Sequence, residues 1–278
     1  MLITKADGTT EEFEPQKLVT SLKRAGAKNQ VAEQVGRDIE QELWNGISTQ
    51  EIYSRAFARL RETRHAVAAR YSLKRAVLDF GPSGFPFEDY IGELFRAEGK
   101  EARVREIIKG RCVEHEVDVV LGGPGEKVFV EAKFHNAAGF KTDLKTVLYV
   151  KARLDDIAAA RKNKGAVEPM RGLVVTNTKF TSVAAQYASC AGVEVLSWEE
   201  PAGHNLHDRI DASGIYPITA LTTINRREKM ALLSQKIVLC RALGADTRAL
   251  ATAGVTGQKA DHVLEEVGAL CVPGKHIE

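Results

Sequence analysis

The first eighty or so residues change from an alternating to a helical pattern of apolar positions. Two short strand-like runs flank Asp7–Gly8, and Asp-Gly between such runs indicates a tight hairpin. Pro15 then stands where a first helical turn begins, and apolar residues follow at helical spacing as far as Gly26. The same spacing predicts three further helices: over about 31–43, from Ser48 or Thr49 onward, and over about 65–79. We therefore expect a β-hairpin followed by a helical bundle.

After Gly81–Pro82 the pattern alternates between helices and strands. A helical run comes first, and two strand-like runs at about 117–121 and 128–134 then flank a glycine-rich turn at 122–125. A helix, a buried strand, a second helix and a last strand follow as far as Leu196. Such alternation is typical of an α/β sandwich, with helices on both faces of a sheet.

The last part of the chain has a helical pattern. A loose polar stretch is expected from Glu200–Pro201 to about Ile215, and apolar spacing then predicts helices over 224–243, through Ala253 and from Lys259. The predicted organisation is therefore multidomain, α+β and α/β, with boundaries at 1–81, 85–200 and 216–278, the last being a small all-α domain.

Composition narrows the class of protein. The 278 residues are 44% hydrophobic and 27% charged, which excludes a disordered chain. The net charge is only +2, so nucleic-acid binding would have to depend on local clusters of positive charge. No run of apolar residues is long enough to span a bilayer, and no signal-peptide pattern is present. The four cysteines form no C-x-x-C pair, which argues against structural zinc. We expect a cytoplasmic protein without a membrane partner.

The central strand pair carries acids and a lysine close together. Glu131 and Lys133 are two residues apart and share one face of their strand, and the preceding turn places Asp118 opposite residue 130 or 131. Crowded carboxylates favour a hard divalent cation such as Mg²⁺ or Mn²⁺, which activates water and neutralises charge on a phosphate. Lys133 is then available to position the water or to hold the phosphate. An E-x-K triplet alone is a very weak signal, but here it lies in a strand pair with apolar neighbours.

This spacing resembles the signature of PD-(D/E)XK nucleases. The order of helices and strands over about 85–200 is similar to the Mrr-type restriction endonuclease catalytic domain, a restriction-endonuclease-like α/β sandwich. The resemblance implies a Mg²⁺-dependent endodeoxyribonuclease, a type IV restriction-like hydrolase, with Asp118 and Glu131 as metal ligands. It also implies catalytic roles for Lys133 and for Glu88, an acid at the start of a helix.

Two further observations bear on this resemblance. Val117 precedes Asp118 where the motif is named for a proline. From Lys133 to Lys164 there are eight basic and three acidic residues, and such an excess supports DNA as a partner through phosphate contacts. A solvated helix face accounts for the same charges equally well.

The N-terminal part resembles an ATP-cone domain, the nucleotide-sensing module of ribonucleotide reductases and of a bacterial repressor of their genes. The resemblance covers nearly all of residues 1–80 and is carried by Thr4–Gly8, Glu11, Phe13, Lys17–Leu18, Gly46–Thr49 and Ala69–Tyr71. It implies that ATP or dATP binds between the hairpin and the helices. Lys5 and Lys17 would meet the phosphates, Thr49 would offer its hydroxyl, the segment from Glu11 to Lys17 would line the nucleotide, and Arg70 would also contribute.

Ala6 stands where the ATP-cone family usually has a basic residue, which weakens phosphate binding, and Lys5 and Lys17 also fit plain surface lysines. No G-x-x-x-x-G-K-[ST] loop is present, so we expect the nucleotide to be an allosteric effector. We predict an endonuclease that forms a homo-oligomer. The main alternative is an inactive DNA-binding regulator whose ATP-cone controls oligomerisation, and an enzyme of nucleotide metabolism is opposed by the lack of paired cysteines or a glycyl-radical segment.

Overall fold

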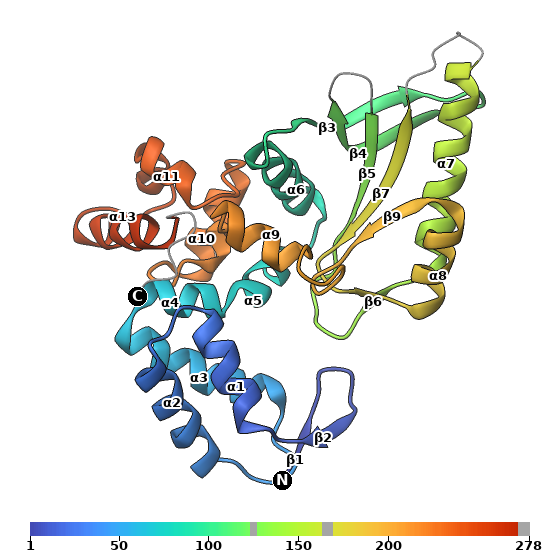
Figure 1. Ribbon diagram of the computed structural model, residues 1–278. Helices are drawn as coiled ribbons and strands as arrows, with labels where there is room; N and C mark the ends of the chain where they lie inside the picture. Colours follow the sequence, from blue (N-terminus) through green and yellow to red (C-terminus); the bar gives the residue numbers. More distant parts are fainter. Residues whose placement is uncertain (123–126, 163–168, 272–278) are drawn as a thin grey trace. The chain divides into compact units, whose positions relative to one another are not determined.

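The computed structural model describes residues 1–122, 127–162 and 169–271, and it divides the chain into two compact units (Figure 1). The first unit combines Met1–Asp79 with the C-terminal part from Tyr216, and the second is Phe80–Ile215. Among the described residues, no helix combines the length and the apolar character needed to cross a bilayer.

The predicted hairpin and helical bundle form the N-terminal part of the first unit. Strands β1 (Leu2–Thr4) and β2 (Thr10–Glu12) pair antiparallel around Gly8, whose φ of 82° suits glycine. Ser48 caps the third helix by accepting a hydrogen bond from the Glu51 amide at 3.0 Å. The helices are α1 (Pro15–Arg24), α2 (Asn29–Gln41), α3 (Thr49–Thr63), α4 (His65–Tyr71) and α5 (Leu73–Leu78).

The single helix predicted over 65–79 is wrong, because the structure has two helices, α4 and α5. They are separated by Ser72, whose hydroxyl donates to the carbonyl of Ala69 at 3.0 Å. A serine that bonds back to the preceding turn competes with the helical ladder. The apolar periodicity continues through this break, so the sequence pattern alone does not reveal it.

The C-terminal part of the first unit is helical, as predicted, but its first helix is shorter. The predicted helix over 224–243 ends at Ser234, and Lys236 has a φ of 62°. Beyond it the chain is extended, and the Cys240 amide donates to the carbonyl of Tyr216 at 2.9 Å. The elements are the 3₁₀ helix η1 (Ile218–Ala220), α10 (Arg226–Ser234), α11 (Arg241–Ala245), α12 (Arg248–Thr252) and α13 (Gln258–Leu270).

This C-terminal part packs directly on the helical bundle. Thr219 donates its hydroxyl to the carbonyl of Ala76 at 2.6 Å, and buried Glu266 accepts hydrogen bonds from the backbone and hydroxyl groups of Thr222 and Thr223. The two sequence-distant parts therefore share one compact unit.

The second unit is the predicted α/β sandwich around a five-stranded mixed sheet. The strand order is β3-β4-β5-β7-β9, antiparallel from β3 to β5 and parallel from β5 to β9. These strands are β3 (Glu101–Lys109), β4 (Glu114–Gly122), β5 (Lys127–Lys133), β7 (Met170–Thr176) and β9 (Val193–Leu196), with a parallel pair formed by β6 (Lys141–Thr142) and β8 (Lys179–Phe180). Figure 1 shows α7 (Leu144–Lys162) and α8 (Ser182–Ala191) on one face and α6 (Phe85–Ala97) on the other.

The polar stretch predicted as loose before Ile215 contains a helix, α9 (Leu206–Ser213), so that prediction was wrong. Asn205 caps the helix by accepting from the Asp208 amide at 2.9 Å. Leu206 and Ile210, four residues apart, are fully buried, and this spacing stabilises a short helix by packing rather than by propensity.

Candidate active site

Asp118 and Glu131 face one another across the β4–β5 pair. Val119 pairs with Val130, so the register continued by one residue places Asp118 opposite Glu131. Asp118 accepts a hydrogen bond from the Ala132 amide through Oδ2 at 2.8 Å. Burial and the charge of Glu131 raise the pKa of Asp118 to about 7. Two carboxylates are therefore held close enough that one resists ionisation.

Glu88 and Lys133 complete the predicted set. Glu88 lies in the first turn of α6, and its largely buried carboxylate adds to the rise in the pKa of Asp118. Burial raises the pKa of Glu88 itself, against the lowering effect of Arg105. Lys133 is exposed at the end of β5. The structure thus gathers the three acids electrostatically and leaves the lysine open to solvent beside them.

Two arginines hold these acids, and neither was singled out from the sequence. Arg105 of β3 donates to Glu88 at 3.2 Å and to Asp89 at 2.6 Å. Its φ of 54° within a strand is a strained conformation for a residue other than glycine. Arg153 of α7 donates to Glu131 at 2.6 Å, its side chain is only 10% exposed, and its Nε is buried without a hydrogen-bond partner.

The sequence held little signal for either arginine. Arg153 was counted only within the local excess of basic residues, and no local pattern predicts a left-handed residue at position 105. Both arginines reach the site from elements distant from the E-x-K strand.

The donor set fits a divalent metal ion. Asp118 and Glu131 present carboxylate oxygens, and their mutual repulsion is what a bound cation would relieve. Within the described ranges no cluster of three or more His, Cys, Asp and Glu side chains is placed to hold a metal. A two-carboxylate site completed by water matches the habit of Mg²⁺, which keeps several waters.

The predicted nucleotide residues lie around the β-hairpin. Thr4 bridges Ser48, and the Thr4 amide donates to the carbonyl of Ile47 at 2.9 Å. This pairing joins the residue before Lys5 to the residue before Thr49. Sequence-distant parts of the predicted site are therefore joined by backbone pairing.

Both predicted lysines are ion-paired with acids of the same region. Lys5 lies 2.6 Å from Glu11, and Lys17 lies 2.7 Å from Glu14. A hydrogen bond from Lys5, together with the charges of Lys5 and Lys17, lowers the pKa of Glu11. Lys5, Glu11 and Lys17 therefore form one electrostatic group.

Arg70 is placed differently from the other predicted nucleotide residues. From α4 it donates to the carbonyls of Ala269 and Leu270 at the end of α13, at 3.0 and 3.4 Å, and its guanidinium lies over the ring of Tyr216. In this structure it joins the C-terminal helix to the bundle, and its role at a nucleotide stays a prediction.

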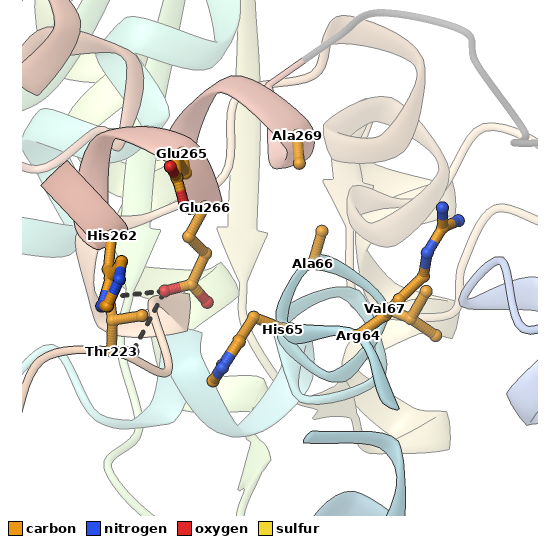
Figure 2. A pocket seen from close by; sticks show the side chains of 9 residues that line it. All are labelled: Arg64, His65, Ala66, Val67, Thr223, His262, Glu265, Glu266 and Ala269. Carbon is orange, nitrogen blue, oxygen red and sulfur yellow. Dashed lines mark hydrogen bonds between the residues drawn. The ribbon is translucent and has the colours of Figure 1, made fainter. Parts of the chain in front are cut away.

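A cavity of about 450 Å³ lies between α4 and α13 in the first unit (Figure 2). It contains none of the residues predicted from the sequence to act at a site. The Glu266 carboxylate at its wall is already bonded to Thr223, as Figure 2 shows. Its lining residues are Arg64, His65, Ala66, Val67, Thr223, His262, Glu265, Glu266 and Ala269.

Comparison with protein families matches three consecutive parts of the chain. Residues 1–79 match the ATP cone domain, residues 82–201 match a restriction endonuclease family, and residues 216–271 match the C-terminal part of AF1548-like proteins.

Individual relatives match a large part of the chain. An uncharacterized protein of Archaeoglobus fulgidus is 33% identical over 177 residues, which are 63% of this chain and 97% of that protein. The crystal structure of the protein of unknown function AF1548 is similar with a TM-score of 0.54 and 31% identity, over 66% of this chain and 96% of that one. MspJI restriction endonuclease in complex with a 27-mer oligonucleotide has 17% identity over 71% of this chain and 39% of that chain, with a TM-score of 0.35, too low to support an argument.

Proposed function

Because the chain belongs to the AF1548-like family and joins an ATP-cone domain to a restriction-endonuclease domain, we propose that it hydrolyses phosphodiester bonds in DNA with a divalent metal ion and is regulated by an adenine nucleotide. The observation that carries the proposal is the partly buried Asp118 opposite Glu131, with an exposed lysine at the end of the strand that carries Glu131.

Each side chain has a defined part in this reaction. Asp118, fixed by the Ala132 amide, and Glu131 would hold the metal ion, and the ion would activate a water and neutralise charge on the phosphate. Lys133 orients the attacking water or the phosphate by its charge, and Glu88 adds an auxiliary acid from α6. Arg153 donates to one oxygen of Glu131, so the other carboxylate oxygen is the one available to a cation while this contact is kept.

The nucleotide is proposed to act as an effector. Lys5 and Lys17 are each paired with a glutamate. A bound triphosphate would take the place of these glutamates as the partner of both lysines, because it carries more negative charge than a single carboxylate. ATP or dATP would then bring the hairpin and α1 together around the phosphates.

Cleavage of supercoiled plasmid with Mg²⁺ or Mn²⁺, with and without ATP, tests the proposal. We expect the wild type to nick or linearise the plasmid, and Asp118→Asn and Lys133→Met to lower the rate by at least about 100-fold. Glu194→Gln is the matched control, because Glu194 is an exposed strand acid paired with Arg171 outside the site. No metal-dependent cleavage of modified or unmodified plasmid, or equal rates in all variants, would contradict the proposal.

One observation favours a second candidate function, a DNA-binding regulator without cleavage. Glu88 and Glu131 are each paired with an arginine. If these ion pairs persist when metal is present, the carboxylates are occupied and the site would bind DNA without hydrolysing it. Tight DNA binding measured by fluorescence anisotropy, together with intact plasmid at every metal concentration, is the result this alternative predicts.

A further inference from the structure

The exposed aromatic side chains of the restriction-endonuclease unit lie on, or directly after, the elements that carry its acids and their arginine partners. Among the described residues from Phe80 to Ile215, the exposed aromatic rings are Phe85, Phe140 and Tyr149, at 58%, 62% and 58% exposure. Single exposed rings are common on protein surfaces, so exposure alone does not assign them a contact, and what matters is where they lie. Their positions are therefore informative.

Two of these rings lie against the arginines that hold the acids. The guanidinium of Arg105, which pairs with Glu88, lies 5.8 Å from the centre of the Phe85 ring. The guanidinium of Arg153, which pairs with Glu131, lies 4.6 Å from the centre of the Tyr149 ring. Each ring is thus one side chain away from a candidate catalytic acid.

The third ring is stacked on a histidine that follows the E-x-K strand. Phe140 lies over His135 with the ring centres 6.0 Å apart and the planes 7° from parallel. His135 is two residues beyond Lys133. Burial and the charge of Lys133 lower the pKa of His135, so its imidazole is neutral at physiological pH and offers a flat aromatic face.

A buried polar network fixes this histidine. The His135 amide donates to Asn177 Oδ1 at 2.9 Å, and Asn177 Nδ2 donates back to the His135 carbonyl at 2.7 Å. His135 Nε2 is hydrogen-bonded to Thr142 at 3.1 Å, and Thr142 donates to Thr176 at 3.0 Å. The three partners are almost completely buried, namely Asn177, Thr142 and Thr176. Their hydrogen bonds therefore fix the position of the His135 ring on which Phe140 stacks.

Exposed lysines surround the same edge of the sheet. Lys133, Lys141 and Lys145 are all exposed, and they lie on β5, on β6 and at the start of α7. Flat rings interleaved with cations suit a strand that presents both base faces and phosphates.

We infer that the site takes DNA in which bases are unpaired and unstacked, and that Phe140 and Tyr149 stack on those bases. A closed duplex offers only base edges in its grooves, because the faces are covered by neighbouring bases. Rings beside the acids can meet base faces only where the strand is single or a nucleotide is turned out of the helix. The inference rests on the proposed function, since it names the substrate class of the same site.

Binding without metal tests the inference independently of cleavage. Three labelled DNAs of one sequence are compared by fluorescence anisotropy: fully paired, paired with a central unpaired loop, and single-stranded. Wild type should prefer the two DNAs that have unpaired bases. Phe140→Ala and Tyr149→Ala should each weaken binding to these two by roughly 5- to 100-fold and leave duplex binding within about twofold.

Three control measurements separate stacking from general hydrophobic contact. Phe140→Trp should keep the preference and Phe140→Leu should lose it, because only the former presents a flat ring. Val183→Ala, at an exposed position of α8, should bind all three DNAs like the wild type. The fluorescence of a 2-aminopurine placed in the loop should change when the wild type binds, and this change should be smaller with Phe140→Leu, which keeps only Tyr149.

The outcomes distinguish this inference from the proposed function. Equal affinity for the three DNAs, a leucine variant that behaves like the wild type, or tighter binding of RNA of the same sequence would overturn it. Cleavage of fully paired DNA as fast as looped DNA contradicts the inference and leaves the nuclease intact. The expected binding preference without any cleavage contradicts the nuclease and leaves the inference standing.

Discussion

Asp118 carries an electrostatic cost in the folded protein. Its pKa is raised from 3.8 to about 7, first by burial and then by Glu131. Because the folded pKa lies above the unfolded one, the cost of ionising the group appears as the pH rises through this interval, and it is fully present above about pH 7. The metal-free protein is therefore less stable at alkaline pH than its other contacts would allow.

The first prediction concerns this cost. Asp118→Asn should stabilise the metal-free protein, and the gain should be about 2 kcal/mol larger at pH 8 than at pH 5, after allowance for the part of the side chain that water reaches. Denaturant unfolding at the two pH values measures it. Saturating Mg²⁺ should stabilise the wild type more than the variant, and a gain independent of pH would contradict the assignment.

At the scale of single residues, the acids and the lysine were predictable and the arginines were not. Asp118, Glu131 and Lys133 lie on one hairpin, so strand alternation and turn position place them together. Arg105 and Arg153 come from a different strand and a helix, and no local periodicity connects them to Glu88 or Glu131. The positions of the two arginines beside these acids depend on tertiary packing, and tertiary packing leaves no periodic pattern in a single sequence.

At the scale of elements, Asp156 ties helix α7 to the β3–β4 turn. Its carboxylate accepts from the amides of Cys112 and Val113 at 2.9 and 3.4 Å and is hydrogen-bonded to His115 at 2.8 Å. The hydrogen bond with His115 holds the pKa of Asp156 well below its usual range. The same helix supplies Arg153, so this attachment also positions the contact to Glu131.

The second prediction tests the attachment. Asp156→Ala should lower Tm and speed hydrogen exchange at the Cys112 and Val113 amides, because both donors lose their acceptor. Since the folded pKa of Asp156 is depressed, the difference from wild type should be present above about pH 4 and shrink at lower pH. Asp155→Ala is the matched control, because its exposed carboxylate pairs only along the helix with Lys151. Equal exchange in the two variants would contradict this role.

Element boundaries failed where long-range contacts decide the backbone. The helix predicted over 224–243 ends early because the backbone near Cys240 bonds to Tyr216, more than twenty residues away, while the apolar spacing continues through the break. Helix α9 was missed although its signals are local. Asn205 is its N-cap, and Leu206 and Ile210 are its buried apolar pair, while the rest of the helix is largely polar. The former error needs tertiary information, and the latter was available from capping rules.

At the scale of the whole molecule, nucleotide binding should act on the first unit. The third prediction is that ATP raises the free energy of unfolding of this unit by about 2.7 kcal/mol when free nucleotide is about 100 times its Kd. Replacing Lys5 and Lys17 with Met should abolish the shift, because both phosphate-facing cations are lost. Thermal unfolding followed by fluorescence measures it.

The control for this prediction is Lys23→Met, which removes a partly exposed lysine of the same α1 that pairs with Glu33 at 3.1 Å. A shift that survives in the double variant would contradict the assignment of the nucleotide residues. Sedimentation velocity on the same samples tests the predicted homo-oligomer, with and without ATP.

The first unit is built from both ends of the chain, leaving at Asp79 and returning at Tyr216. The restriction-endonuclease domain is thus inserted into the first unit and has two covalent joints to it, one on each side. A protease that cuts one joint divides the chain into two polypeptides, and the inserted domain then stays covalently attached to the first unit only through the other joint. Two cuts are needed to release the inserted domain as a separate fragment. By the same topology, a different domain could be spliced between these two positions without dividing the sequence of the first unit in any new place.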